Sequence, residues 1–407
     1  SALFGSLSGS ASANVATTGM ITIPMMKKVG YTGVKAASIE AVASTGGLVL
    51  PPVMAATGFL MAEFLGLPYS AIALAAAIPA LLFYLCVYLQ VDLEAGKGGI
   101  TVWEDNSLPK LKRAAIQVIP VAMAFAVLLY VLFGLMQSPE NSAFAATVAT
   151  VVISLLIPTM RRAFKQYITI LASAGEAVVF IAVMCAVAGL VVGCLGLTGL
   201  GSSLSQNLVT MAGGSVWLLL LFAALSCIVL GMGVPVTATY IILVILVGPA
   251  LVQVGVNELA AHMFVFYFGT LSFLTPPVCL AVFVAASIAN SNPWRTAMYA
   301  LRFAVIAYVI PFVFVFNESF LMQGNTEAII QAVLAGIVGV FLLSIGLVGY
   351  WAGPVHFILR LVMLGAGILA FWIGATSWLI WLLTLAILIG AHCHQKIRNS
   401  HVVRVSI

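Results

Sequence analysis

Charged residues are what this chain has fewest of. Asp, Glu, Lys and Arg make up 7% of its 407 residues, whereas 63% are hydrophobic, and the mean hydropathy is +1.21. Because soluble domains carry about 25% charged residues, this composition excludes an ordinary soluble protein. The apolar stretches are long enough for membrane-spanning helices, which need roughly 20 residues each. The sequence therefore predicts an all-α integral membrane protein that lies in a lipid bilayer.

Other absences narrow the function. No basic run is dense enough to follow a phosphate backbone, so we expect no nucleic-acid partner. The six cysteines form no CxxC pair, and five of them lie in apolar stretches where they serve as packing residues. The chain has no Walker A motif, and no nucleophile–base pair or metal-ligand set stands at membrane depth. We therefore predict that the chain is not an enzyme and carries no cofactor.

The chain does contain one motif that appears twice. Each copy has a short run of small, mostly polar residues, then an apolar stretch, then a second such run followed by Pro-Pro. The first copy comprises residues 9–14 (GSASAN), 44–47 (STGG) and Pro51-Pro52; the second comprises 231–239 (GMGVPVTAT), 270–275 (TLSFLT) and Pro276-Pro277. In a bilayer, non-helical backbone occurs only where it is buried or lines a cavity. Matched helix breaks in two halves of a chain are typical of a transporter's binding site.

The placement of the charges predicts that the two copies enter the membrane from opposite sides. If the polar stretch 92–113 is cytoplasmic and each copy begins with a re-entrant hairpin, all sixteen Lys and Arg residues fall on the cytoplasmic half. The outer side then keeps only acidic residues: Glu63, Glu140, Glu258, Glu318 and Glu327. We therefore predict an inverted repeat with two re-entrant hairpins, two broken helices and a cytoplasmic C-terminus.

Further spans are expected between and after the two copies. Before the second copy, we expect spans over 69–91, 114–136, 143–160 and 176–197, an amphipathic segment over 161–173 and a loop over 200–214. After it, we expect spans over 294–316, 328–348, 355–373 and 377–391, and a basic tail over 392–407.

The helix breaks also predict a chemistry. Helices that begin near Ala13, Val53, Val236 and Val278 present unpaired N–H groups and a positive dipole end, which suits a carboxylate. The opposing half-helices present free carbonyls, which suit a cation such as Na⁺. These half-helices are expected to end near Leu50, Gly231 and Thr275. Together, these anion-binding and cation-binding groups predict cation-coupled carboxylate transport. The simpler alternative is that Gly and Pro only kink packed helices, which membrane helices tolerate.

The two copies resemble the large membrane subunit of tripartite ATP-independent periplasmic (TRAP) transporters, over residues 1–320. Residues 40–47 (EAVASTGG) and 61–66 (MAEFLG) are similar to the fused permeases that work with TAXI-type binding proteins. The resemblance implies Na⁺-driven uptake of a small organic anion by an elevator mechanism in a bacterial inner membrane. The anion would be a C4-dicarboxylate, a 2-oxo acid or a glutamate-like acid. A periplasmic TAXI-type substrate-binding protein would deliver it. The resemblance also implies a missing N-terminal four-helix region of the same chain.

The predicted organisation alternates between a moving and a fixed part. Residues 1–66 hold the first hairpin and broken helix, and 201–290 hold the second; together they form the transport domain. Residues 67–200 supply scaffold and connecting helices, and 291–320 a further transmembrane helix. Residues 321–407 form a C-terminal three-helix extension with a basic tail.

The resemblance also assigns candidate site residues. The substrate carboxylate is expected between the two hairpin tips, near Ser12, Asn14, Thr45, Val236 and Thr237. A first Na⁺ site is expected at Ser10, Asn14, Ser44, Gly46 and Gly47. A second Na⁺ site is expected at Gly231, Gly233, Thr237, Thr270 and Thr275. The chain has Val234-Pro235 where many large subunits carry an acidic residue.

Three ionisable residues at membrane depth can each have one of two roles. Glu40, one turn before Ser44, is either a cation ligand or proton carrier for coupling, or a helix-end carboxylate near the headgroups and Lys35. Arg302 either snorkels to the cytoplasmic surface or clamps the substrate carboxylate. His262 is either a packed or surface residue or part of a proton relay.

Two other functions are alternatives to a TRAP transporter. The nearest alternative is a binding-protein-independent Na⁺/H⁺-coupled carboxylate carrier of the divalent-anion type, which has similar hairpins. The TAXI-like stretches favour the TRAP reading over this carrier. A non-transporting structural subunit is a further alternative, for which two matched helix breaks would have no purpose.

Overall fold

The fold is known from a computed structural model that describes residues 1–100, 111–156 and 164–373. Within these residues the regular structure is helical, apart from one isolated bridge between Tyr350 and Pro354. The described helices therefore agree with the predicted all-α class. The predicted span 377–391 and the basic tail, with the orientation of the C-terminus, lie outside the described residues.

The first motif folds as a helix pair followed by an interrupted helix. It comprises α1 (Ala2–Ser8), α2 (Ala11–Val29), α3 (Gly33–Gly47) and α4 (Thr57–Leu65). Gly9 lets the chain turn between α1 and α2 because its φ of 67° lies in the left-handed region that glycine adopts without strain. Ser10 then caps α2, its side chain accepting a hydrogen bond from the backbone of Ala13. The predicted break at Pro51-Pro52 lies between α3 and α4.

The second motif repeats this order of elements. It comprises α10 (Val216–Gly231), α11 (Val236–Gln253), α12 (Glu258–Leu271) and α13 (Leu280–Ala289). Gly233, with a φ of 78°, makes the turn between α10 and α11. The chain leaves α12 before Pro276-Pro277 and resumes as α13. Both Pro-Pro peptide bonds are cis.

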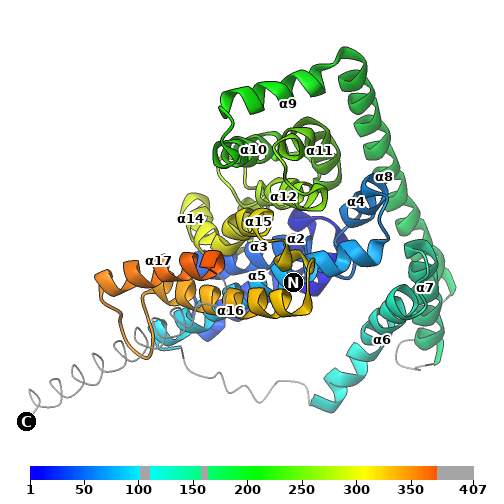
Figure 1. The fold of residues 1–407 in the computed structure, drawn as a ribbon. Coiled ribbons are helices and arrows are strands. Elements are labelled where there is room, and N and C mark those ends of the chain that lie inside the picture. Colours follow the sequence, from blue (N-terminus) through cyan, green and yellow to red (C-terminus); the bar gives the residue numbers. More distant parts are fainter. Residues whose placement is uncertain (101–110, 157–163, 374–407) are drawn as a thin grey trace, which may run out of the picture.

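The two motifs exchange their last half-helices. α13, from the second motif, packs against α2 and α3 of the first, and α4, from the first motif, packs against α11 and α12 of the second. Figure 1 shows α4, from the first motif, beside α12 of the second. Particular contacts join the halves: Lys27 Nζ donates to the Ala289 carbonyl at the end of α13 at 3.1 Å, and the rings of Phe64 and Tyr240 stack 6.2 Å apart. The two motifs therefore form one packed unit.

Between the motifs, the chain runs through a further group of helices. These are α5 (Tyr69–Gly98), α6 (Leu111–Leu129), the π-helix η1 (Tyr130–Gly134), α7 (Pro139–Leu156), α8 (Phe164–Thr198) and α9 (Leu200–Met211). The paired helices α6 and α7 and the start of α8 project at the lower right of Figure 1. Their apolar side chains are largely exposed, as expected of helices that face lipid.

Two sequence predictions in this region are wrong. The segments 161–173 and 176–197 were expected to be separate, but the described residues form one continuous helix, α8, because an isolated glycine such as Gly175 does not end a helical pattern. The expected loop over 200–214 is mostly the helix α9, which leaves α8 at an angle of 72°. Its apolar residues follow a helical period at Leu200, Leu204 and Leu208, a signal hidden by the surrounding Gly and Ser.

The rest of the chain packs against α5. It comprises α14 (Pro293–Phe303), α15 (Val305–Phe316), the 3₁₀ helix η3 (Glu318–Leu321), α16 (Thr326–Val348) and α17 (Phe357–Ile373). α16 packs on both α5 and α17. A Cβ on Gly339 would lie 2.9 Å from the Gly367 carbonyl oxygen, and one on Gly367 would lie 3.0 Å from that of Gly339. Small residues thus let α16 and α17 approach closely, as is common between membrane helices.

Length and composition identify the membrane-crossing candidates. Five described helices are long and apolar enough to cross a bilayer, or six if the bent pair of α8 and α9 counts as one span. The continuous segments Tyr69–Gly98, Pro293–Phe316 and Thr326–Val348 correspond to expected spans. Val236–Gln253, expected as an arm of a re-entrant hairpin, is also long enough to cross. The re-entrant geometry therefore stays a prediction.

A buried carboxylate ties α5 to α3 and α14. The helix α5 continues past the expected span end at residue 91, and this extension carries Glu94, whose side chain is 2% exposed. Its two oxygens lie 2.5 Å from Lys35 Nζ and 2.6 Å from Arg302 Nη2. Because Arg302 is paired with Glu94, it does not stand free to clamp a substrate, whereas its snorkelling to the cytoplasmic surface stays a prediction. Sequence reasoning missed the pairing because Glu94 was assigned to a polar loop.

Removing the charge of Glu94 tests this bridge. We expect Glu94→Gln to lower the Tm of the purified protein, because Lys35 and Arg302 would lose their shared counter-charge. The cost is about 2 kcal/mol, in the range for hydrogen bonds to charged groups. Glu63→Gln, at an exposed position on α4, is the matched control and should leave Tm unchanged. Equal melting of the two variants, measured by a thermal-shift assay in detergent, would contradict a stabilising role for the bridge.

Candidate functional site

The tip of the first hairpin gathers three predicted ligands in one turn. Ser10 Oγ accepts from Ala13 N at 3.4 Å and lies 3.4 Å from the Oγ of Ser12. Asn14 is fully buried and its Nδ2 donates to the Ser1 carbonyl at 2.9 Å. Ser10 and Ser12 are half-buried, so this turn presents hydroxyl oxygens at its surface and an amide oxygen beneath it.

The glycines at the end of α3 are explained by close packing. A Cβ on Gly46 would lie 2.0 Å from Cε1 of Phe83 on α5. A Cβ on Gly47 would lie 2.7 Å from the Ala2 carbonyl oxygen and 2.7 Å from the Cα of Gly5 on α1. Both positions require glycine for packing, whether or not a cation binds there.

The tip of the second hairpin is held by a serine that the sequence analysis did not single out. Ser272 Oγ lies 2.9 Å from the Gly231 carbonyl oxygen, which joins the end of α10 to the end of α12. Gly233 is exposed at the turn, Val236 is buried, and Thr237 is half-buried in the first turn of α11. Ser272 stands inside the predicted run 270–275, so the signal for it was present.

The ends of α3 and α12 face one another across a small cavity of about 10 Å³. Thr45 and Gly46 line it from α3, and Tyr267 and Thr270 from α12. The Tyr267 and Thr270 hydroxyls are buried and have no hydrogen-bond partner among the described residues. About 10–15 Å³ suffices for one water molecule, so this cavity suits a water or an ion rather than an organic acid.

The two hairpin tips are not joined to each other as the ends of α3 and α12 are. No hydrogen bond of the described residues links the run 10–14 to the run 231–237. The structure thus brings Thr45 together with Thr270, whereas the position of a substrate between Ser12 and Thr237 stays a prediction.

The expectation of free carbonyls at the half-helix ends is wrong for Leu50 and stays a prediction for Gly231 and Thr275. Those ends were predicted near Leu50, Gly231 and Thr275. Ser6 Oγ donates to the Leu50 carbonyl at 3.0 Å. Ser272 Oγ lies 2.9 Å from the Gly231 carbonyl oxygen and 2.7 Å from that of Gly269, and its single hydrogen serves one of the two. α12 ends at Leu271, whose carbonyl accepts a third hydroxyl, that of Thr275, at 2.8 Å. A buried carbonyl without a partner is costly, so nearby hydroxyls supply one. Each oxygen keeps a second lone pair that a cation can use.

The helix starts agree better with expectation. α2, α4, α11 and α13 begin at Ala11, Thr57, Val236 and Leu280, within four residues of the predicted positions. Ser10 caps α2, but α4, α11 and α13 have no side-chain cap. No side chain therefore competes with an anion at these helix starts, although Gly58 N of α4 already donates to the Met54 carbonyl and Val282 N of α13 to the Cys279 carbonyl.

Glu40 lies deep in the first motif. Its side chain is 2% exposed and its carboxylate contacts hydroxyls of α1, α2 and α3, including Ser44 Oγ at 3.2 Å. Lys35, the partner expected in one reading, pairs with Glu94 instead. The reading of Glu40 as a helix-end carboxylate near the headgroups and Lys35 is therefore wrong.

His262 is a packed residue of α12. It is 8% exposed, and its Nδ1 lies 2.7 Å from the Tyr240 hydroxyl. The contact joins α12 to α11 within the second motif. This geometry agrees with the packed reading.

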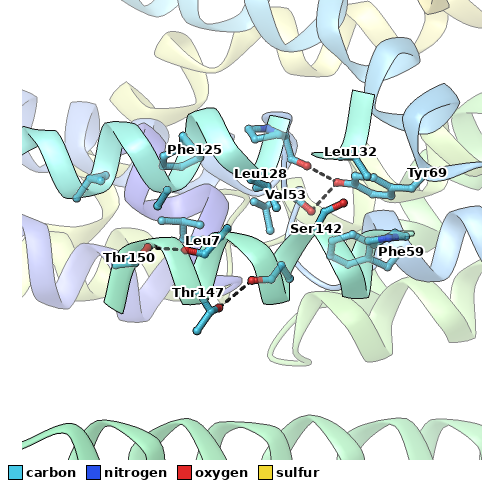
Figure 2. Close-up of a pocket in the computed structure, with 16 residues that line it drawn as sticks. Leu7, Val53, Phe59, Tyr69, Phe125, Leu128, Leu132, Ser142, Thr147 and Thr150 are labelled. Atoms are coloured by element: carbon cyan, nitrogen blue, oxygen red, sulfur yellow. Dashed lines mark hydrogen bonds between the residues drawn. The ribbon is translucent and has the colours of Figure 1, made fainter. Parts of the chain in front are cut away.

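An apolar cavity of about 390 Å³ lies where α6 and α7 approach the break after α3 (Figure 2). The hydroxyls of Ser142, Thr147 and Thr150 on its wall donate to carbonyls four residues earlier in the chain. Tyr69 Oη donates to the Pro52 carbonyl at 2.6 Å, as the dashed line in Figure 2 shows. These polar atoms are already bonded, so the cavity suits hydrocarbon and not a carboxylate.

Paired helix breaks, exchanged half-helices and several apolar helices define a membrane protein of the permease class. The chain belongs to the family described as "Tripartite ATP-independent periplasmic transporter, DctM component", which it matches over residues 1–329. This is a family of multi-pass inner membrane permeases and not of enzymes.

Curated relatives are distant in sequence. The chain is 24% identical to the C4-dicarboxylate TRAP transporter large permease protein DctM of Pseudomonas aeruginosa, over 76% of this chain and 73% of that protein. It is 24% identical to the 2,3-diketo-L-gulonate TRAP transporter large permease protein YiaN of Escherichia coli, over 77% and 73%. It is 23% identical to the isethionate TRAP transporter permease protein DctMQ of Oleidesulfovibrio alaskensis, over 71% of this chain, and spans 45% of that relative's length.

The close approach of Gly46 to Phe83 gives a test of the α3–α5 contact. We expect Gly46→Ala to prevent folding or lower Tm strongly, since the added Cβ would overlap a buried ring. The double variant Gly46→Ala/Phe83→Ala should recover part of that loss, because contacting residues couple by about 0.5–3 kcal/mol.

The matched control is Gly193→Ala on α8, where a Cβ would meet nothing within 4 Å. It should fold as the wild type does, as judged by yield and size-exclusion profile. Additive effects of the Gly46 and Phe83 substitutions would show that the two positions do not touch.

Proposed function

We propose that this chain is the transport subunit of a Na⁺-coupled uptake system for a small organic anion. The observation that carries the proposal is the pair of matched helix breaks, whose half-helices are exchanged between the two motifs. A break inside an apolar protein is tolerated where it lines a cavity, and transporters use such breaks to bind substrate and ions near the midplane.

Uncapped helix starts support an anionic substrate. α4, α11 and α13 present backbone N–H groups and positive dipole ends without a side-chain acceptor. The relatives are named as transporters of C4-dicarboxylates, 2,3-diketo-L-gulonate and isethionate. For this chain we propose a carboxylate near Ser12, Asn14, Thr45, Val236 and Thr237, from a C4-dicarboxylate, 2-oxo acid or glutamate-like acid.

The oxygen atoms at the breaks fit Na⁺ as the coupling ion. Hydroxyl, amide and carbonyl oxygens are suitable ligands for a hard cation, and Ser10, Asn14 and Ser44 supply them at the first break. At the second break, the hydroxyl of buried Thr270, which has no hydrogen-bond partner within the described ranges, is such an oxygen. The carbonyls of Gly46, Gly47, Gly231 and Gly233, with the hydroxyls of Thr237 and Thr275, complete the two proposed sites.

The interlocked motifs would move as one body. We assign residues 1–66 and 201–290 to the moving transport domain and 67–200 and 291–320 to the frame, in an elevator mechanism. Residues 321–407 would extend the frame, since α16 packs on α5. The bridge from Lys35 to Glu94 on α5 crosses this proposed boundary, so sliding would have to break it.

The proposed partners follow from the family. A periplasmic substrate-binding protein would deliver the anion, and a small membrane region would complete the permease. The stretches 40–47 and 61–66 favour a binding protein of the TAXI type. A cytoplasmic C-terminus is part of the same proposal, from the distribution of Lys and Arg.

Uptake into proteoliposomes tests the proposal. The full-length permease and its binding protein would be supplied with labelled dicarboxylates, 2-oxo acids and amino acids, with and without an inward Na⁺ gradient. We expect uptake that requires both the gradient and the binding protein. Uptake without the binding protein would instead indicate a carrier of the divalent-anion type, and uptake indifferent to Na⁺ would contradict the coupling.

Thr237→Ala tests the proposed substrate site. We expect kcat/KM for uptake to fall about tenfold or more, the loss expected for one hydrogen bond to a charged group, about 1.5–3 kcal/mol. The control is Thr210→Ala on α9, an exposed threonine that donates within its own helix. Similar transport by the two variants at equal protein levels would remove Thr237 from the site.

A further inference from the structure

Four hydroxyl groups surround the buried carboxylate of Glu40. They form the hydroxyl cluster, which comprises Ser1, Thr18, Thr22 and Ser44. Ser1 Oγ lies 2.7 and 2.8 Å from the two carboxylate oxygens. Thr18 Oγ1 and Thr22 Oγ1 each lie 2.5 Å from one of them. The cluster joins Ser1, the residue before α1, to α2 and α3 around a single negative charge.

This charge has no cationic partner in the described part of the chain. Both ion pairs found there go to Glu94, one of them from Lys35. The ammonium of Lys27, on the same helix as Thr18, binds the Ala289 carbonyl. Burying an isolated carboxylate is very costly, so a buried one is normally paired with a positive charge. The 2% exposure of Glu40 therefore calls for its charge to be neutralised, by a bound cation or by a proton.

The hydrogens of the cluster are too few for its contacts. Each hydroxyl carries one hydrogen. Thr18 Oγ1 lies 2.9 Å from the Asn14 carbonyl oxygen, and Thr22 Oγ1 lies 3.0 Å from that of Thr18, the usual acceptors of a threonine inside a helix. One hydrogen cannot serve both that carbonyl and the carboxylate, so some oxygen pairs face each other without a hydrogen between them. A bound cation removes this conflict, because every oxygen can then act as a ligand.

The cluster is continuous with the first hairpin tip. Thr18 Oγ1 lies 3.4 Å from the amide oxygen of Asn14, and Ser44 belongs to the run 44–47. Gly19 keeps the helices close, because a Cβ there would lie 3.3 Å from the Cγ of Glu40. A cation among these oxygens would contact both arms of the first motif at once.

We propose that Glu40 supplies the negative charge of the first Na⁺ site, with the hydroxyl cluster as its neutral ligands. One carboxylate and neutral oxygens balance a monovalent ion, whereas Ca²⁺ sites usually use several carboxylates. The binding of Na⁺ also fastens α2 to α3, since both helices supply ligands. The inference rests on the proposed Na⁺ coupling only for the identity of the ion.

Thermal unfolding measured against Na⁺ concentration tests the site without any transport assay. The full-length purified permease would be melted in increasing NaCl, with KCl keeping the ionic strength constant. A ligand that binds the folded state raises Tm with its concentration. We expect wild-type Tm to rise with Na⁺ and not with K⁺. In Glu40→Gln, which keeps the shape and loses the charge, the midpoint of this rise should shift at least tenfold or the rise should vanish.

A second pair of variants keeps the test valid if Glu40→Gln does not fold. Thr22→Val removes one hydroxyl ligand and should shift the Na⁺ midpoint about three- to tenfold. Thr17→Val, on the same helix but with an exposed hydroxyl that bonds to the Ala13 carbonyl, should not shift it. Glu63→Gln controls for the loss of one acidic residue.

Several outcomes would overturn the inference. They are equal stabilisation of the wild type by Na⁺ and K⁺, an unchanged Na⁺ midpoint in Glu40→Gln, or equal shifts in Thr22→Val and Thr17→Val. Na⁺-driven uptake with an unchanged Na⁺ dependence in Glu40→Gln would reject this site and leave the proposed function intact. Failure of the wild type to transport would reject the proposed function while the melting data still decide the site.

Discussion

Interrupted helices inside a membrane protein must find partners for the backbone groups that each break releases. Here, hydroxyl side chains supply many of them. Ser6 bonds to Leu50 after α3, and Ser272 reaches Gly231 after α10. Tyr69 bonds to the carbonyls of Pro52 and Val53. Because little bulk water reaches a bilayer core, this internal bonding is the condition on which both breaks depend. A carbonyl oxygen that accepts one hydrogen bond keeps a second lone pair. The carbonyls at each break can therefore still bind an ion.

The exchange of half-helices packs the two breaks into one unit. α4 and α13 each pack on the other motif, so each motif is completed by a half-helix of its counterpart. The ends of α3 and α12 then meet at a cavity large enough for one water or ion. Helix starts without side-chain caps lie in the same interlocked unit. A body that holds anion-binding N–H groups and cation-binding oxygens is suited to carry both ligands together.

The sequence predicted the repeated breaks because Gly, Pro and hydroxyl residues interrupt long apolar runs at matched positions. It also placed the helix starts within four residues. It could not predict which groups would meet across the fold. The pairing of Glu94 with Lys35 and Arg302 joins residues far apart in the chain, and so does the contact of Ser6 with Leu50. Thr18 and Thr22, four residues apart on an apolar helix, did carry a signal for a partner such as Glu40.

The central claim is that both hairpin tips contribute to one substrate site. Single cysteines at Ser12 and Thr237, in a cysteine-free background, would be labelled with a thiol reagent. Labelling would be repeated with Na⁺ and succinate, 2-oxoglutarate or glutamate, with Thr17→Cys as the exposed control. We predict that the same acid, with Na⁺, slows labelling at both tips and leaves the control unchanged. Protection at one tip alone, or at neither tip while uptake persists, would contradict a shared site.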